Sequence, residues 1–371
     1  MEQIAFDSLM RNRATVLIVG GGFVAGHLID RLEHENVNIR LLTRHRPKHL
    51  PPHVQCIAGD FHDRPVLRRC LSGVQAVYHL ASPVGKNWQD YMEKTVAPAV
   101  EMARLAAAAG VDRFFYTSSI DLHDSSQPYY RITGETPADP DIRPRNHYAR
   151  AKAACEAHLR ELHRTTSMSV TIFRLGMTIG TGGSPAHRGV GHFRSPTCVY
   201  LWGNGANRLP FVLADDAADA LVLAMSNPRA GGKTLLVCAP PALTAKEYAD
   251  AVAARVQVPV SVRSWPIGLF WAAEACKELI KHLMQHPNRR AASLHDWQCR
   301  THRAEYDPSA TMRLLGWRPT SDKATLIARG INPAVDEFIN HRTPEKQQRV
   351  RIASNLWVCL ALSLNLAQIS D

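Results

Sequence analysis

Residues 15–26 read TVLIVGGGFVAG, a strand-like run followed at once by a glycine turn. The turn fits Gly-x-Gly-x-x-Ala at Gly20, Gly22 and Ala25. The first glycine permits a tight turn, the second lets the backbone approach a pyrophosphate, and the small third residue lets the next helix pack on the strand. The helix N-terminus then points at the phosphates. The pattern predicts a dinucleotide site contacted by Gly20, Gly22, Phe23 and Val24.

Short apolar runs alternate with helical patterns through the first half of the chain. Runs without polar alternation are typical of strands buried on both faces, as in a parallel sheet covered by helices. The sequence therefore predicts an α/β fold, a doubly wound parallel (Rossmann) sheet with a smaller C-terminal substrate lobe. The predicted strands are 15–19, 38–43, 54–57, 76–80, 113–118 and 169–174, and the predicted helices include 25–33, 91–109 and 148–163.

The pattern changes after about residue 175. We predict a mainly NAD(P)-binding domain over 1–175, remaining Rossmann strands mixed with the substrate lobe over 176–335, and a tail over 336–371. Glycine, proline, histidine and arginine predict an irregular loop over 180–196, near the ligand-binding edge of the sheet. A strand and helix are expected over 211–226 and a long amphipathic helix over 266–284. The apolar run 356–367 is too short to span a bilayer, and packing or an oligomer contact is expected there before a membrane surface.

Composition narrows the class of protein. The 371 residues are 45% hydrophobic and 21% charged, which excludes disordered, collagen-like and coiled-coil chains. Eight cysteines occur singly, without a C-x-x-C pair, which predicts reduced thiols in a cytoplasmic protein and no metal site. No secretory signal or transmembrane segment is visible. The net charge of +11 fits a phosphate-bearing cofactor, an anionic membrane or arginine-rich codon usage; without a nucleic-acid motif, no nucleic-acid partner is expected.

The end of the second predicted strand bears on the choice of nicotinamide cofactor. An acidic residue there binds the ribose 2′-hydroxyl of NAD, whereas arginine accepts the 2′-phosphate of NADP. The sequence has Arg44, with Arg46 to assist, and no carboxylate. NADP is therefore favoured, with NAD as the alternative. If these arginines have no role in binding, they simply belong to a solvated basic loop. Further predicted contacts are Asp60 and Phe61 after the third strand, and Leu80, Ala81 and Ser82 after the fourth.

A tyrosine and a lysine lie four residues apart at the start of a predicted helix. This spacing places Tyr148 and Lys152 on one face, one turn apart. A neighbouring ammonium and a nicotinamide charge are expected to lower the tyrosine pKa, so that Tyr148 exchanges a proton with a carbinol oxygen. Ser119 ends the fifth strand, where its hydroxyl can stabilise charge on that oxygen. The predicted catalytic residues are Ser119, Tyr148 and Lys152.

In this order the motifs resemble the extended short-chain dehydrogenase/reductases, the group of NAD-dependent epimerases/dehydratases and 3β-hydroxysteroid dehydrogenase-like enzymes. The resemblance implies that Ser119, Tyr148 and Lys152 form the catalytic set, that the small-molecule substrate sits under a C-terminal lobe, and that two chains form a homodimer through 91–109 and 148–163. Ala25 replaces the usual last glycine, and Thr95 replaces a usual asparagine, which puts a proton relay there in doubt. The matching segments are 20–26, 59–60, 78–81, 116–119, 144–152, 174–180, 211–216 and 315–319.

The family resemblance leaves the reaction open. Family dehydratases carry an acidic pair directly after the catalytic hydroxyl residue, where this chain has Ile120 and then Asp121. We expect an NADP-preferring oxidoreductase acting on a secondary alcohol or ketone, because Ile120 and Met177 suit a less polar substrate. The alternative is an NAD-dependent nucleotide-sugar epimerase, and a cofactor-sensing scaffold is a third hypothesis. Loop residues that fit either an anionic substrate tail or a solvated loop are His187, Arg188, His192 and Arg194.

Overall fold

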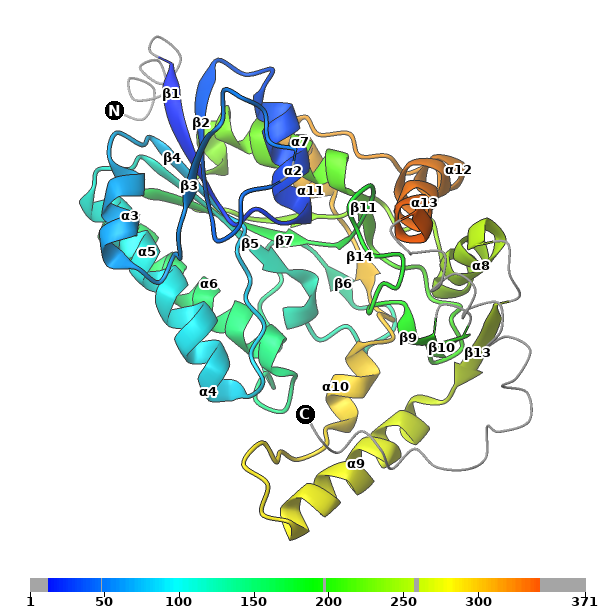
Figure 1. Cartoon of the computed structure of the whole chain (residues 1–371). Coiled ribbons are helices and arrows are strands. Elements are labelled where there is room, and N and C mark those ends of the chain that lie inside the picture. Colours follow the sequence, from blue (N-terminus) through cyan, green and yellow to red (C-terminus); the bar gives the residue numbers. More distant parts are fainter. Residues whose placement is uncertain (1–12, 48, 196–197, 257–259, 341–371) are drawn as a thin grey trace.

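A parallel sheet forms the centre of the molecule (Figure 1). The structure is a computed structural model that describes residues 13–47, 49–195, 198–256 and 260–340. Seven strands run in the order β12-β7-β5-β4-β1-β2-β3, and every neighbouring pair is parallel. They are β1 (Ala14–Val19), β2 (Val37–Thr43), β3 (Gln55–Ala58), β4 (Ala76–His79), β5 (Arg113–Ser119), β7 (Ser169–Leu175) and β12 (Thr234–Val237).

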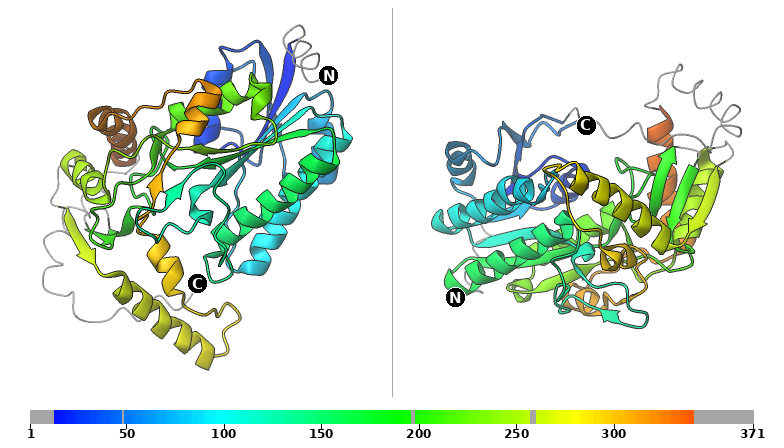
Figure 2. Two further views of the ribbon diagram at one scale, coloured as in Figure 1. Left: turned by 180° about the vertical axis from the view of Figure 1, so that it is seen from behind. Right: turned by 90° about the horizontal axis from the view of Figure 1, so that it is seen from below.

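The apolar runs become strands buried from both sides. In β1, Val16 and Ile18 face one core, while Leu17 and Val19 face the other. The first core is covered by α2 (Phe23–Leu32), α7 (Ala214–Met225) and α11 (Ser309–Leu315), and the second by α3 (Arg64–Leu71), α5 (Ala97–Ala108) and α6 (His147–Thr165). Figures 1 and 2 show these two helical layers. The predicted doubly wound α/β fold is confirmed.

A smaller lobe of short sheets and helices follows at the carboxyl edge of the large sheet (Figure 2). Its sheets are β9 (Gly191–Ser195) with β10 (Cys198–Trp202) and β13 (Ser261–Trp265), β8 (Met177–Ile179) with β11 (Phe211–Leu213), and β6 (Arg131–Ile132) with β14 (Glu305–Tyr306). Its helices are α8 (Ala245–Val256), α9 (Ile267–Leu283), α10 (Leu294–Cys299), α12 (Lys323–Thr325) and α13 (Asn332–Asn340).

Two predicted segments differ in detail from the structure. The helix expected over 91–109 starts earlier, as α4 (Trp88–Tyr91), and passes through a π-helical turn (Met92–Val96) before α5. Pro98 follows this turn within continuous helical backbone, where its missing N–H removes one hydrogen bond of the helix. The loop predicted over 180–196 is wrong at its end, because β9 pairs antiparallel with β10. The glycine there hid the strand: a Cβ on Gly191 would lie 2.5 Å from the Tyr200 carbonyl oxygen.

The tail predicted over 336–371 lies mostly outside the described residues, and so does the apolar run 356–367. Its first five residues belong to α13, which packs on α8. Within the described part of the chain, no helix is long and apolar enough to cross a membrane. The domain boundaries at 175 and 335 remain predictions.

The glycine turn joins β1 to α2 against the end of β4. Gly20 has φ +101°, and a Cβ added to it would lie 2.9 Å from the Ala81 backbone nitrogen. Both the backbone angle and the lack of space therefore require glycine at this position. Gly22 differs, because a Cβ there would meet no described heavy atom within 4 Å. The turn thus packs tightly on the protein at Gly20 and faces open space at Gly22.

Candidate functional site

A cavity of about 1100 Å³ lies at the carboxyl edge of the sheet, between the Rossmann core and the smaller lobe. The ends of β4, β5 and β7 form its floor, and α6 forms one wall. The predicted catalytic residues Ser119, Tyr148 and Lys152 all line this cavity. Ser119 is the last residue of β5, and the other two lie in the first turns of α6.

The start of α6 is fixed by a side-chain cap. The Asn146 side chain accepts a hydrogen bond from the Ala149 N–H at 2.9 Å. Asn146 is itself held by Asp296 of α10, whose carboxylate accepts from the Asn146 backbone N–H at 2.8 Å and from its side-chain amide at 3.0 Å. Capping fixes where the helix begins, and therefore where Tyr148 points.

Lys152 is almost fully buried beneath the cavity. Its Nζ donates to the Thr117 carbonyl oxygen at 2.7 Å and lies 5.6 Å from the centroid of the Tyr148 ring. Burial lowers the pKa of Lys152 to about 8, although the neighbouring Cys155 and Glu156 oppose this shift. The ammonium is thus anchored on β5 and carries a depressed pKa.

The pKa of Tyr148 moves opposite to the sequence-based expectation. Burial raises it to about 12, and the nearby Ser119 and Ser82 hydroxyls only partly oppose that rise. The Lys152 ammonium does not reverse the shift, because it is bound to the Thr117 carbonyl and sits in the same low-dielectric environment. With the protein groups alone, Tyr148 is a neutral phenol that can donate a proton.

The predicted cofactor residues follow neighbouring strands at one edge of the sheet. Gly20 follows β1, Arg44 follows β2, and Asp60 lies two residues after β3. Arg44 is exposed and close enough to Asp60 to lower the pKa of that carboxyl group. Burial raises the Asp60 pKa, but the hydrogen bonds from His62 outweigh burial, and Arg44 adds a smaller lowering, so the pKa is lowered overall. A charged arginine and a carboxylate therefore stand beside the glycine turn.

Other predicted residues divide between the cavity and its supports. Leu80, Ser82 and Val24 line the cavity, and among the described residues the buried Ser82 hydroxyl has no hydrogen-bond partner. Ala81 does not line the cavity; it packs closely against Gly20 of the glycine turn. Phe61 is buried with its ring 5.6 Å from that of His79 at the end of β4. Phe23 packs against residues 180–183 and is not part of the cavity wall.

The residues present fit a dinucleotide. Gly22 opens onto free space at the start of α2, and within the described chain no side chain caps that helix. The first helical N–H groups are therefore available to phosphate oxygens. The unpartnered Ser82 hydroxyl offers a further polar contact inside the cavity.

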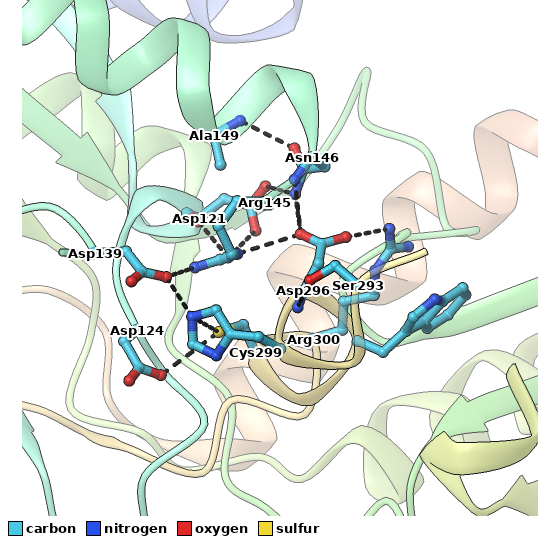
Figure 3. Close-up of polar contacts among 12 residues, drawn as sticks. Asp121, Asp124, Asp139, Arg145, Asn146, Ala149, Ser293, Asp296, Cys299 and Arg300 are labelled. Carbon is cyan, nitrogen blue, oxygen red and sulfur yellow. Dashed lines mark hydrogen bonds and ion pairs between the residues drawn. The ribbon is translucent and has the colours of Figure 1, made fainter. Parts of the chain in front are cut away.

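A buried arginine that sequence reasoning missed joins the two parts of the molecule (Figure 3). Arg145 donates to Asp139 at 2.7 Å and to Asp296 at 3.2 Å, and all three side chains are at most 2% exposed. It also donates to the backbone carbonyls of Asp121 and His123, each at 2.7 Å. Burial opposes the charge, but the surrounding carboxylates raise the Arg145 pKa overall. Its five donors therefore tie the loop after β5 to α10.

A second buried pair holds α6 on the sheet. Arg174 of β7 contacts both carboxylate oxygens of Glu156, at 3.0 and 2.8 Å. Burial would raise the Glu156 pKa, but the arginine keeps it below its usual value. Glu156 lies one turn after Lys152, so this pair fixes the helix face that carries Tyr148 and Lys152.

The smaller lobe supplies an aromatic and basic wall that no sequence motif marked. Trp202 and Trp297 line the cavity together with Arg300, whose guanidinium lies 4.3 Å from the Trp297 ring centroid. Of the four basic loop residues predicted to meet a substrate tail, His187, Arg188 and His192 line the cavity, whereas Arg194 does not. Burial lowers the pKa of His187 to about 4, so it is neutral near pH 7.

Figure 3 also shows a polar cluster beside Arg145 that joins residues distant in the sequence. Potential metal ligand atoms of Asp124, His295 and Cys299 lie within 4.8 Å of one another, although the spacing of the cysteines predicted no metal site. Burial raises the pKa of the Cys299 thiol to about 12, and its sulfur lies 3.5 Å from an Asp124 oxygen. His295 meanwhile contacts Asp139 at 2.7 Å. At neutral pH the protonated thiol serves as a hydrogen-bond donor here.

Comparison with known proteins identifies the family. Residues 16–238 match the model of the NAD dependent epimerase/dehydratase family. The chain belongs to this family. It is part of the extended short-chain dehydrogenase/reductase superfamily and uses an NAD(P) nucleotide as cofactor.

Relatives of this epimerase/dehydratase-family protein differ in activity. It is 26% identical over 264 residues to the uncharacterized protein y4nG of Sinorhizobium fredii, covering 68% of this chain and 63% of that one, so the chain spans less than two thirds of that relative. It is 25% identical over 278 residues to the sterol-4-alpha-carboxylate 3-dehydrogenase erg26 (decarboxylating) of Schizosaccharomyces pombe, covering 70% and 81%. The structure of MoeE5 with UDP-glucose and NAD aligns with TM-score 0.65 and 20% identity, over 87% and 99% of the two chains.

Removing the Arg145 guanidinium is expected to lower the free energy of unfolding of this protein strongly. Arg145→Met leaves Asp139 and Asp296 buried without their cation, and breaking a buried pair in this way costs about 3–5 kcal/mol. Urea unfolding followed by circular dichroism measures the loss. The matched control is Arg131→Met, a 68% exposed arginine 3.6 Å from Asp307, with an expected effect below about 1 kcal/mol. Equal effects of the two variants would contradict the role given to Arg145.

Because burial lowers the pKa of Lys152, the free energy of unfolding is expected to depend on pH in a defined range. The pKa of Lys152 is about 8 in the folded protein, against 10.5 as the ordinary value. Between these pH values the unfolded chain binds more protons, so the penalty from burying Lys152 is largest near neutral pH and shrinks as pH rises. Lys152→Met removes this dependence. The variant's stability relative to wild type should therefore fall by about 2 kcal/mol between about pH 7 and 9.5.

Chemical unfolding at several pH values tests this expectation, with Lys233→Met as the control for an exposed lysine. A Lys152→Met difference that stays constant across the range would show that burial does not depress the lysine pKa in this way.

Proposed function

We propose that the protein is an NADP-preferring oxidoreductase that transfers hydride at a secondary alcohol or ketone. The observation that carries this proposal is the convergence of Ser119, Tyr148 and Lys152 on one cavity with apolar walls. Those walls include Ile120, Met177, Val84, Phe193, Trp202 and Trp297. A homodimer and NADP rather than NAD are parts of the same proposal.

The protein groups supply the proton and the polar contacts of the reaction. When bound, the nicotinamide cofactor supplies or accepts the hydride. In the reductive direction the neutral Tyr148 phenol donates its proton to the substrate oxygen, while the Ser119 hydroxyl donates a hydrogen bond to the same oxygen. Lys152, anchored on the Thr117 carbonyl, provides the positive charge that stabilises the phenolate formed.

Several features favour reduction over dehydration or epimerisation. Ile120 follows Ser119, so the first acid of a dehydratase pair is missing. The Asp121 carboxylate accepts a hydrogen bond from the Asn146 amide at 3.1 Å and faces the Arg145 guanidinium. These contacts use Asp121 to hold the loop after β5 in place. The apolar cavity walls suit an apolar substrate, such as the sterol carboxylate named for erg26, better than a polar sugar nucleotide.

A nucleotide-sugar epimerase is the second candidate. The fold likeness to MoeE5, solved with UDP-glucose and NAD, favours it, and so do the cavity's basic residues Arg188, Arg290 and Arg300. Two of these arginines already pair with carboxylates, Arg290 with Glu274 and Arg300 with Asp296. That pairing leaves less positive charge for a diphosphate and makes this the weaker candidate.

Tyr148→Phe is expected to lower kcat/KM by about 10²–10⁴-fold, because the proton donor is lost while the ring is kept. The assay follows NADPH oxidation over a panel of ketones, and fluorescence titration checks that NADPH still binds. Tyr116→Phe is the matched control, since the centroid of this buried tyrosine ring lies 4.9 Å from Lys152 Nζ but Tyr116 does not line the cavity.

The fate of deuterium from 4-deuterated NADPH then separates the two candidates. Net transfer to the product identifies a reductase. Tightly held NAD with epimerised product and no net exchange would replace the proposal by the epimerase, and an unchanged rate in Tyr148→Phe would remove Tyr148 from either reaction.

Arg44→Ser is expected to weaken NADPH binding by about tenfold or more and to leave NADH binding within about twofold, since only NADPH carries the 2′-phosphate. Titration of cofactor-free protein with both nucleotides measures this. Arg68→Ser, an exposed arginine of α3, is the control and should alter neither affinity. Equal loss for both nucleotides would contradict selection of NADP by Arg44.

A further inference from the structure

Helix α9 (Ile267–Leu283) turns its two carboxylates toward the protein. Glu274 accepts a hydrogen bond from the Trp297 indole at 2.6 Å and pairs with Arg290. Glu278, one turn later, is buried, accepts from the Arg290 backbone N–H at 2.8 Å and pairs with Lys281 at 2.7 Å. A surface helix normally buries apolar residues and exposes its carboxylates. In α9 this arrangement is reversed.

The opposite face of α9 is apolar along its whole length. At 100° per residue, the side chains opposite Glu274 and Glu278 form one continuous stripe. All of them are exposed, Leu279 by 61% and Leu283 by 77%. Figures 1 and 2 show α9 at the edge of the molecule. We call this the α9 stripe: Leu269, Ala272, Ala273, Cys276, Leu279, Ile280, Leu283 and Met284.

Within residues 260–293, the segment that contains α9, the charged residues that remain exposed are positive. Residues 260–293 contain two acidic residues, Glu274 and Glu278, and their side chains are only 12% and 7% exposed. Arg263, Lys277 and Arg289 of the same segment are exposed. Since the two carboxylates of this segment pair internally, the segment offers an outside partner an apolar stripe and exposed cations, of which Lys277 lies on α9 itself. The chain as a whole carries +11.

We propose that α9 binds an anionic lipid surface, with the α9 stripe in the boundary between headgroups and acyl chains. An interfacial helix combines an apolar face with cations that can reach the headgroups, and α9 offers its stripe together with Lys277. Lys277 can extend its charged end to phosphate while its methylenes stay on the apolar side.

Charge favours lipid over a second copy of this chain as the occupant. Two copies joined through the α9 stripe would bring two sets of Arg263, Lys277 and Arg289 toward each other, with no exposed carboxylate of this segment to balance them. An anionic bilayer offers the opposite charge, worth roughly 1 kcal/mol per Lys or Arg near the surface.

The proposed surface lies directly behind the cavity. Trp297 stacks on Phe270 of α9 at 5.4 Å between ring centroids, and Trp297 and Arg290 both line the cavity. Phe270 on the inner face of α9 therefore connects this helix to the cavity wall. The proposal stands on the helix itself and does not depend on the reaction proposed above.

Co-sedimentation of the full-length protein with vesicles tests the proposal. We expect binding to phosphatidylcholine vesicles containing phosphatidylserine, weaker binding to phosphatidylcholine alone, and release by salt. The double variant Leu279→Gln/Leu283→Gln removes apolar surface without adding charge and is expected to reduce partitioning about tenfold or more. Both leucines are exposed, so the fold is retained, which circular dichroism checks.

Matched single variants locate the binding surface. Leu283→Gln should weaken vesicle binding, whereas Leu223→Gln, an exposed leucine on α7, should not. The proposal is overturned if the wild-type protein does not bind the anionic vesicles, or if the double variant binds them as well as wild type does. It is also overturned if sedimentation shows that wild type is a dimer, that the double variant is a monomer, and that neither form binds vesicles.

Discussion

The buried guanidinium of Arg145 connects the parts of this molecule on which the site depends. It lies two residues before His147, the first residue of α6, and contacts carboxylates from the 139 loop and from α10. A buried cation is tolerated only when its donors are satisfied, and here two carboxylates and two carbonyls do so. The smaller lobe is thereby held against the start of α6.

This lock sets the geometry of the proposed proton donor. Asp296, one partner of Arg145, also holds Asn146, and Asn146 caps the helix that carries Tyr148. From the other side, Arg174 and Glu156 fix the same helix to β7. Tyr148 therefore stands on a helix held at its start and at its middle by buried ion pairs, which is the rigidity that a positioned acid requires.

Helix α9 shows how the same lobe can serve two surfaces. Its carboxylates hold Trp297 and Arg290 at the cavity, so its apolar residues are left to face outward. The inward carboxylates position the side chains of the cavity wall. The α9 stripe is not covered by the Rossmann core or by the described part of the lobe. The amphipathic pattern of 266–284 was visible in the sequence, but which face lies inside was not.

The sequence by itself determined the α/β class, six of the seven strands, the glycine turn and the order of Ser119, Tyr148 and Lys152. These follow from local rules: apolar runs make buried strands, glycine is favoured at φ +101°, and a spacing of four places two side chains on one helix face. Only the tertiary structure decided the pairing of Arg145 with Asp296, 151 residues away, the aromatic wall of the cavity, the strand β9 and the raised pKa of Tyr148. The reason is physical. Burial and long-range ion pairs depend on which segments meet in space, and no local pattern around Arg145 or Tyr148 encodes that meeting.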